Sequence, residues 1–159
     1  MKRHSCAASL ALAVLVVLGL TGPAAAGAQV PFKGRLEGVD TTTPLTPPFV
    51  SATVEATGEA THLGEFTLTI LVTGNRATGM ATGTFLFTAA NGDTVFGALS
   101  GQSTLTAPGV ITIVENMIIT GGTGRFAGST GSFTSTRLRN VVTGVVTGSF
   151  VGTIRLHDD

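Results

Sequence analysis

The sequence predicts an all-β protein, folded as an antiparallel eight-stranded up-and-down barrel. Three observations predict it. Polar and apolar residues alternate with a period of two along most of the chain, turn-forming residues divide the chain into about eight runs, and the chain after the N-terminal segment has no helical period. Short links make successive strands antiparallel, and closure into a barrel leaves no exposed edge. A two-layer β-sandwich is the alternative.

The first 28 residues read as a secretory signal peptide. Lys2 and Arg3 precede an apolar run, and small residues follow it, so we expect cleavage after Ala26 or Ala28. The apolar run is broken by Thr21-Gly22-Pro23, well short of the roughly 20 residues that cross a bilayer. The expected mature chain is one domain, residues 29–159, that is secreted or periplasmic and has no membrane partner after cleavage.

The composition of the mature chain excludes several kinds of chemistry. Its lack of cysteine excludes disulfides and thiolate sites. Removal of Lys2 and Arg3 leaves seven Lys and Arg against nine Asp and Glu, a net charge of −2. The cations are scattered, with Arg137 and Arg139 the only close pair, which argues against nucleic acid as a partner.

The strands follow in order. Residues 51–60 alternate between polar and small apolar side chains, and over 66–73 the apolar residues at even positions alternate with Thr67, Thr69 and Thr73. Thr residues alternate with apolar residues again over 82–88 and 143–154. Turns are expected at residues 62–64, 74–75, 91–92, 108–109, 121–124 and 140. Three prolines predict an extended loop over Asp40–Pro48. Gly144, Gly148 and Gly152 recur along the last strand and favour a tightly curved barrel over a sandwich.

One hairpin resembles a known family. The segment TGGTGRFAGSTG, Thr120–Gly131, follows an apolar strand and is similar to a hairpin of the barrel family that contains allene oxide cyclases and dirigent proteins. Its expected turn residues are Gly121, Gly122, Gly124, Phe126, Gly128 and Gly131. The resemblance implies a secreted eight-stranded barrel, often trimeric, that holds a small apolar molecule. In this family dirigent proteins orient radicals, whereas the cyclases isomerise a fatty-acid epoxide.

The same hairpin satisfies a relaxed dinucleotide-binding pattern, Gly122-x-Gly124-x-x-Ala127. That pattern requires a following helix to hold phosphate, and the residues after Gly128 are strand-like. We therefore expect no cofactor. Glu59, His62 and Glu65 surround a turn, and a solvated turn explains them better than a metal site, so we expect no metal.

Glu115 is the candidate functional residue, because it interrupts the apolar face formed by Ile111, Ile113, Met117 and Ile119. A carboxylate in an apolar barrel could act as an acid, a base or a ligand anchor. The alternative is a paired or exposed glutamate. A loop over 121–131 would place Glu115 opposite Arg137 as an ion pair, whereas a tighter turn would place it opposite Thr130.

We favour a binder of a small apolar molecule over an enzyme, with Glu115, Arg137, Met117, Phe85 and Phe87 as the binding residues. One alternative is a structural barrel plugged by Phe66, Phe85, Phe87, Phe96 and Phe150. Another is an isomerase that uses Glu115. Because the opposite face of the 110–118 strand is also mostly apolar, we expect a homo-oligomer whose interface includes this strand.

Overall fold

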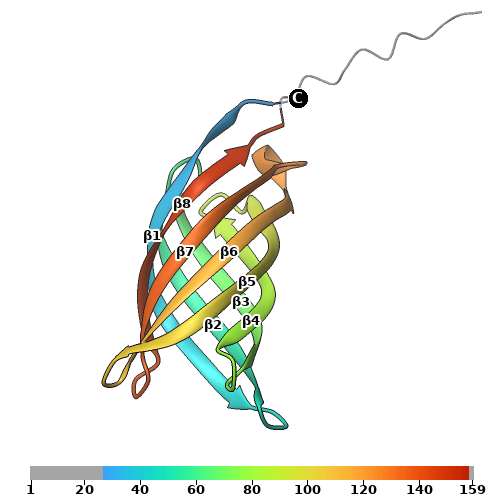
Figure 1. Cartoon of the computed structure of the whole chain (residues 1–159). Helices are drawn as coiled ribbons and strands as arrows, with labels where there is room; N and C mark the ends of the chain where they lie inside the picture. The colour runs from blue at the N-terminus through green and yellow to red at the C-terminus, as the bar shows by residue number, and fades with distance from the viewer. Residues whose placement is uncertain (1–26, 158–159) are drawn as a thin grey trace, which may run out of the picture.

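The structure, a computed structural model, describes residues 27–157 as one closed barrel of eight antiparallel strands (Figure 1). The strands are β1 (Gln29–Pro44), β2 (Phe49–Ala60), β3 (Gly64–Asn75), β4 (Met80–Ala89), β5 (Thr94–Ala107), β6 (Val110–Gly122), β7 (Thr130–Asn140) and β8 (Val145–Arg155). Each strand pairs with the next, and β1 pairs with β8. The predicted barrel is confirmed, and the two-layer alternative is wrong.

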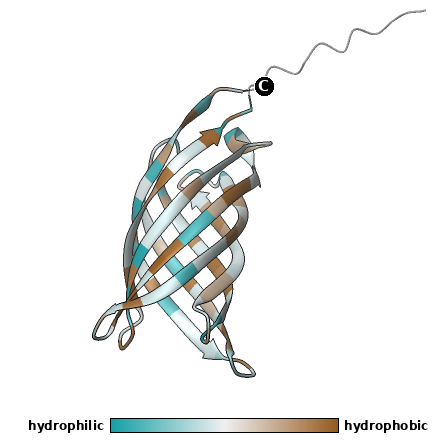
Figure 2. Cartoon of the chain, in the orientation of Figure 1, coloured by the Kyte–Doolittle hydropathy of each residue, from teal (hydrophilic) through white to brown (hydrophobic). Residues whose placement is uncertain are grey.

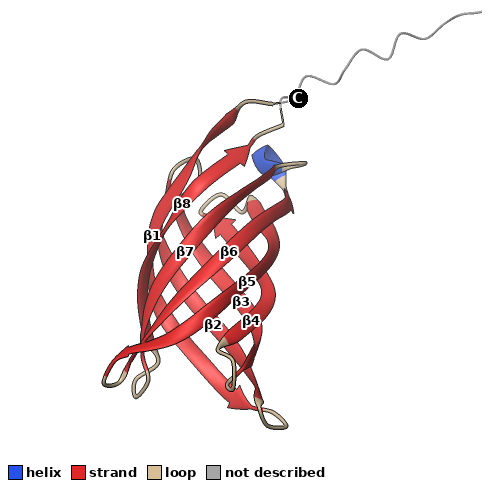
Figure 3. Ribbon diagram, in the orientation of Figure 1, coloured by secondary structure: helices blue, strands red, loops and turns tan. Residues whose placement is uncertain are grey.

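Short connections join the strands, and the only helical element of the described residues is the 3-10 turn η1, Gly124–Phe126 (Figure 3). Within residues 27–157 no helix is long and apolar enough to span a bilayer. The predicted signal peptide falls on residues that are almost all outside the described part of the chain. That prediction therefore stays an expectation.

The first connection differs from the expected loop over Asp40–Pro48. Strand β1 continues through Thr41–Thr43 to Pro44, which pairs with Val50, so the connection is reduced to residues 45–48. Three consecutive β-branched threonines favour extended backbone, and a proline at the end of a strand costs no interior ladder bond. As a result Asp40 belongs to the barrel wall, where it is 6% exposed.

Alternation places one set of side chains inside the barrel, and the wall seen from outside mixes polar and apolar residues (Figure 2). Aromatic rings fill the half of the interior that lies toward the two described termini. Six phenylalanines contact one another there with ring centroids 4.9–6.2 Å apart: Phe32, Phe66, Phe85, Phe87, Phe133 and Phe150. We call this set the aromatic cluster. The plugged-barrel alternative placed Phe96 inside, but Phe96 lies on the outer wall and is 39% exposed.

The glycine-rich hairpin between β6 and β7 covers the aromatic end. Phe126 is fully buried there, and the Arg125 guanidinium lies 4.9 Å from the centre of its ring. Gly124 and Gly128 adopt φ of 56° and 69°, a region that disfavours other residues. The other predicted turn glycines lie in strands: Gly121 and Gly122 end β6, and Gly131 is the second residue of β7.

Candidate functional site

The other half of the barrel contains a cavity of about 770 Å³. Its apolar wall includes Val50, Ala52, Val54, Val72, Ala81, Leu105, Ile111, Ile113 and Val141. Exposed residues that belong to the connections, such as Arg76 and Thr78, also line it, so the cavity reaches the surface at this end. We call this end, where the β1–β2, β3–β4, β5–β6 and β7–β8 connections lie, the mouth.

A buried ion pair lies in the middle of the barrel, on the cavity wall. Arg137 donates from Nη2 to Glu115 Oε1 at 2.6 Å and from Nε to Oε2 at 3.2 Å. Both side chains are 2% exposed. Two parallel hydrogen bonds between a guanidinium and a carboxylate are the strongest geometry for such a pair. Glu115 is therefore neutralised by a fixed cation.

The pair fits inside the barrel because glycines face it from the neighbouring strands. Gly101 of β5 lies opposite Glu115, and Gly148 of β8 lies opposite Arg137. A Cβ at Gly101 would approach Glu115 Cγ to 2.6 Å, and one at Gly148 would approach Arg137 Cγ to 2.8 Å. The two long side chains therefore occupy space that side chains at positions 101 and 148 would otherwise fill.

The ion pair was one of the predicted outcomes, but neither predicted register is correct. Glu115 lies opposite Ser135, and Arg137 lies opposite Ile113. The observed partner of Glu115 is two residues from the first expectation and five from the second, because β6 continues to Gly122 and η1 occupies the loop. Arg137 and Glu115 share the inner face, so the guanidinium reaches the carboxylate diagonally across the two strands.

A second ion pair lies nearer the mouth and was not predicted. Arg139 Nε is 3.3 Å from Asp40 Oδ2, and Arg139 Nη2 donates to Thr42 Oγ1 at 3.2 Å. The available signal was the Arg-x-Arg spacing of Arg137 and Arg139, which places both on one face of a strand. Asp40 could not be recognised as their neighbour while it was assigned to a loop.

The charges that line the cavity do not cancel. Both of its carboxylates, Asp40 and Glu115, are paired with arginines of β7. Arg76 also lines the cavity, and it forms no ion pair with any residue of the described chain. Buried Arg137 Nη1 has no hydrogen-bond partner among the described residues either. The cavity therefore has an excess of one positive charge and of hydrogen-bond donors.

The other predicted binding residues lie elsewhere. Met117, Phe85 and Phe87 are at most 2% exposed and belong to the packed core, and none of them lines the cavity. Alternation correctly placed them inside, but it could not tell which end of the interior is filled. Of the five predicted residues, the structure brings Glu115 and Arg137 to the cavity.

The structure also shows where the possible metal ligands of the β2–β3 turn lie. Glu59 and Glu65 lie opposite each other at the end of the hairpin, and His62 occupies the turn with a φ of 65°. Among residues 27–157 no group of three or more His, Cys, Asp or Glu side chains is arranged to hold a metal ion.

The fold and the cavity define a class: a small closed β-barrel with one filled half and one half open to the surface. This barrel has the same fold as a solved dirigent protein. A solved structure of a pterocarpan synthase dirigent protein superimposes on it with a TM-score of 0.57 over 84% of this chain and 88% of that chain, at 11% sequence identity. At that identity the likeness concerns the fold. No protein-family model matches the sequence, and no curated protein matches it.

Proposed function

We propose that this protein is an exported, non-catalytic barrel that binds one small, apolar molecule in the cavity at its mouth. The observation that carries the proposal is a cavity of about 770 Å³ with a mainly aliphatic wall. This volume is within the range of sites for small organic ligands, roughly 300–1,000 Å³. The dirigent-like fold supports the same proposal.

The charges at the cavity favour a ligand that is neutral or negatively charged. The two carboxylates already have cationic partners. In contrast, Arg76 has no anionic partner among residues 27–157, and Nη1 of Arg137 has no hydrogen-bond partner there. A cationic ligand would meet an excess of positive charge in a partly buried place. We therefore expect a hydrocarbon or aromatic body with one oxygen acceptor.

We propose a non-catalytic protein because both carboxylates that line the cavity, Glu115 and Asp40, are paired with arginines. An isomerase that used Glu115 would need this carboxyl group free to exchange a proton, and the bidentate contact with Arg137 opposes that. A purely structural, plugged barrel is less well supported, because the aromatic cluster fills only one half of the interior.

Anilinonaphthalene sulfonate is a suitable probe, since it is apolar, anionic and fluorescent in dry sites, and the chain contains no Trp or Tyr to interfere. We expect saturable binding of one probe per barrel. Ala52 lines the cavity, so the larger ring of Ala52→Phe should occupy the cavity and abolish this binding. Ala90→Phe is the control, because Ala90 is exposed in the β4–β5 connection at the other end. Equal binding by both variants would refute a ligand site in the cavity.

The ligand from the natural source requires a second experiment. Native mass spectrometry of protein purified from its own source should show a mass increment of a few hundred daltons that Ala52→Phe lacks. The same spectra test export, because the mature chain should begin at Gly27 or Gln29. A full-length, unprocessed chain would contradict export. Ligand binding would then be tested by the probe experiment alone.

A further inference from the structure

The mouth of the barrel carries a ring of exposed apolar side chains. All four connections at this end, or the strand ends beside them, contribute at least one. Their members are 40–87% exposed: Leu45, Phe49, Met80, Leu105, Val141 and Val142. We call these residues the mouth ring. Exposing so many large apolar side chains around one opening is costly for a monomer in water, and such patches mark contact surfaces.

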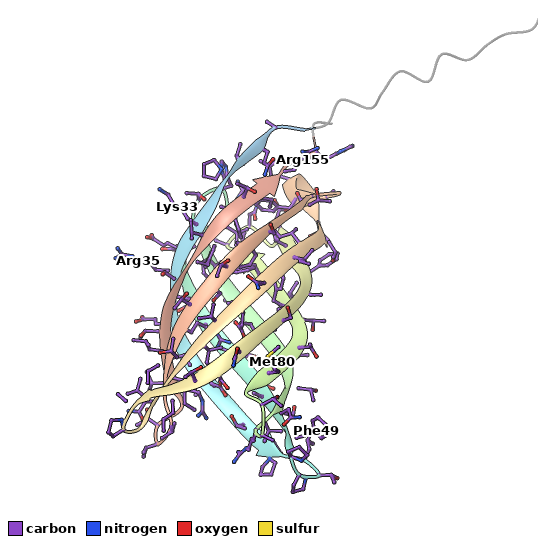
Figure 4. The ribbon with its side chains drawn as sticks, viewed as in Figure 1. Lys33, Arg35, Phe49, Met80 and Arg155 are labelled. Carbon is purple, nitrogen blue, oxygen red and sulfur yellow. The ribbon has the colours of Figure 1, made fainter. Side chains whose placement is uncertain are left out.

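Figure 4 labels two members of the mouth ring, Phe49 and Met80, which show where the ring lies. Phe49 and Met80 lie toward the lower end of the barrel in Figure 4, while Lys33, Arg35 and Arg155 lie in its upper half. Hydrophobic colouring also reaches the hairpins at the lower end in Figure 2. The ring and the labelled cations are therefore separated along the barrel axis.

The two ends of the barrel also differ in the number of charged residues. The mouth segments, residues 44–50, 75–80, 105–111 and 140–145, contain one charged residue, Arg76, and no carboxylate. At the opposite end, Glu65, Asp93 and Arg125 lie in or beside the connections. An apolar surface with a cation and no acid matches the interface of a bilayer, where hydrocarbon lies beneath phosphate groups.

We propose that the mouth ring inserts into the surface of a lipid bilayer and places the opening of the cavity against the membrane. The ring residues project from four separate hairpins around an opening, and a fluid interface accepts them without a partner of matching shape. Continuity with the aliphatic cavity wall would let an apolar ligand pass between bilayer and barrel without crossing water. This inference revises the sequence-based expectation that the mature chain has no membrane partner.

The test is flotation of the mature protein with vesicles of phosphatidylcholine, alone and mixed with phosphatidylglycerol. We expect the wild-type protein to float with both, more strongly with the anionic mixture. The double variant Leu45→Asp, Val142→Asp should lower the vesicle partition coefficient about tenfold or more, because two apolar side chains lose their burial. Arg76→Gln should weaken binding to the anionic vesicles by at most about fivefold.

Val151→Asp is the matched control. Val151 is 66% exposed on the outer wall of β8, away from the mouth, and its substitution should leave flotation unchanged. Leu45 and Val142 do not line the cavity, so the double variant should still bind anilinonaphthalene sulfonate in solution. Loss of flotation with retained probe binding separates this inference from the proposed ligand site.

Three results would overturn the inference. Wild-type protein that stays with the soluble fraction for both vesicle types excludes a lipid contact. Equal losses in Val151→Asp and in the double variant would place the contact elsewhere. A wild-type dimer that the double variant converts to monomers, with no flotation of either protein, would identify the ring as a contact between two copies of this chain.

Discussion

Arg137 of β7 lies directly opposite Gly148 of β8, and the missing side chain of the glycine provides the space that the arginine stem occupies. A Cβ at position 148 would lie 2.8 Å from Arg137 Cγ and 2.6 Å from the carbonyl oxygen of Thr136. The backbone oxygen cannot move away without disturbing the sheet. The glycine is thus a requirement of the buried ion pair.

Gly148→Ala should therefore destabilise the barrel by about 1–3 kcal/mol, the usual cost of overpacking an interior. Gly74→Ala is the matched control, because the nearest atom to its new Cβ is 3.5 Å away, an ordinary contact. Urea unfolding followed by circular dichroism measures both. Equal stability of the two variants would show that position 148 tolerates a side chain.

The ion pair itself predicts a non-additive pair of substitutions. Glu115→Leu or Arg137→Met alone leaves one buried charge without its partner, which costs about 3–5 kcal/mol. The double variant removes both charges and keeps similar volumes, so its stability should return to the wild-type value or exceed it. A double-mutant cycle in urea measures the coupling. Simple addition of the two losses would mean that the pair contributes no coupling.

The aromatic cluster and the outer wall predict different effects for two phenylalanines. Phe87 is fully buried and contacts all five other rings of the cluster, so Phe87→Ala should cost about 3–5 kcal/mol. Phe96 is 39% exposed on the outer wall, and Phe96→Ala should cost less than about 1 kcal/mol. Comparable losses of free energy would contradict the placement of Phe96 outside.

The outer wall of β3–β6 supports a homo-oligomer as a further proposal. Ile118 is 57% exposed and lies in one register line with Ala98, Thr84 and Leu71, the last of which is 53% exposed. We expect sedimentation to show an oligomer that Ile118→Asp dissociates. Val151→Asp, on β8, should leave the mass unchanged. A wild-type monomer at high micromolar concentration would remove this proposal.

Much of the fold could be predicted because its signals are local. Alternation of threonine with apolar residues marks β2, β3, β4 and β8, and an Asn-Gly and a Pro-Gly turn mark the β4–β5 and β5–β6 connections. The loop predicted over Asp40–Pro48 was wrong because proline content outweighed the threonine run before it. The register of the β6–β7 hairpin was wrong because the length of a glycine-rich loop is not set by its composition.

The sequence by itself determined that residues 29–159, which contain no cysteine, form an antiparallel barrel, since a period of two and turn chemistry are properties of neighbouring residues. It also selected Glu115 as the candidate residue, with an inner position and Arg137 as its partner among the alternatives. Tertiary structure decided which half of the interior is filled, that Asp40 meets Arg139, and that the apolar residues of four connections gather around one opening. These relationships join residues up to about a hundred positions apart. They arise only when β1 closes on β8 and each strand's register along the barrel is set.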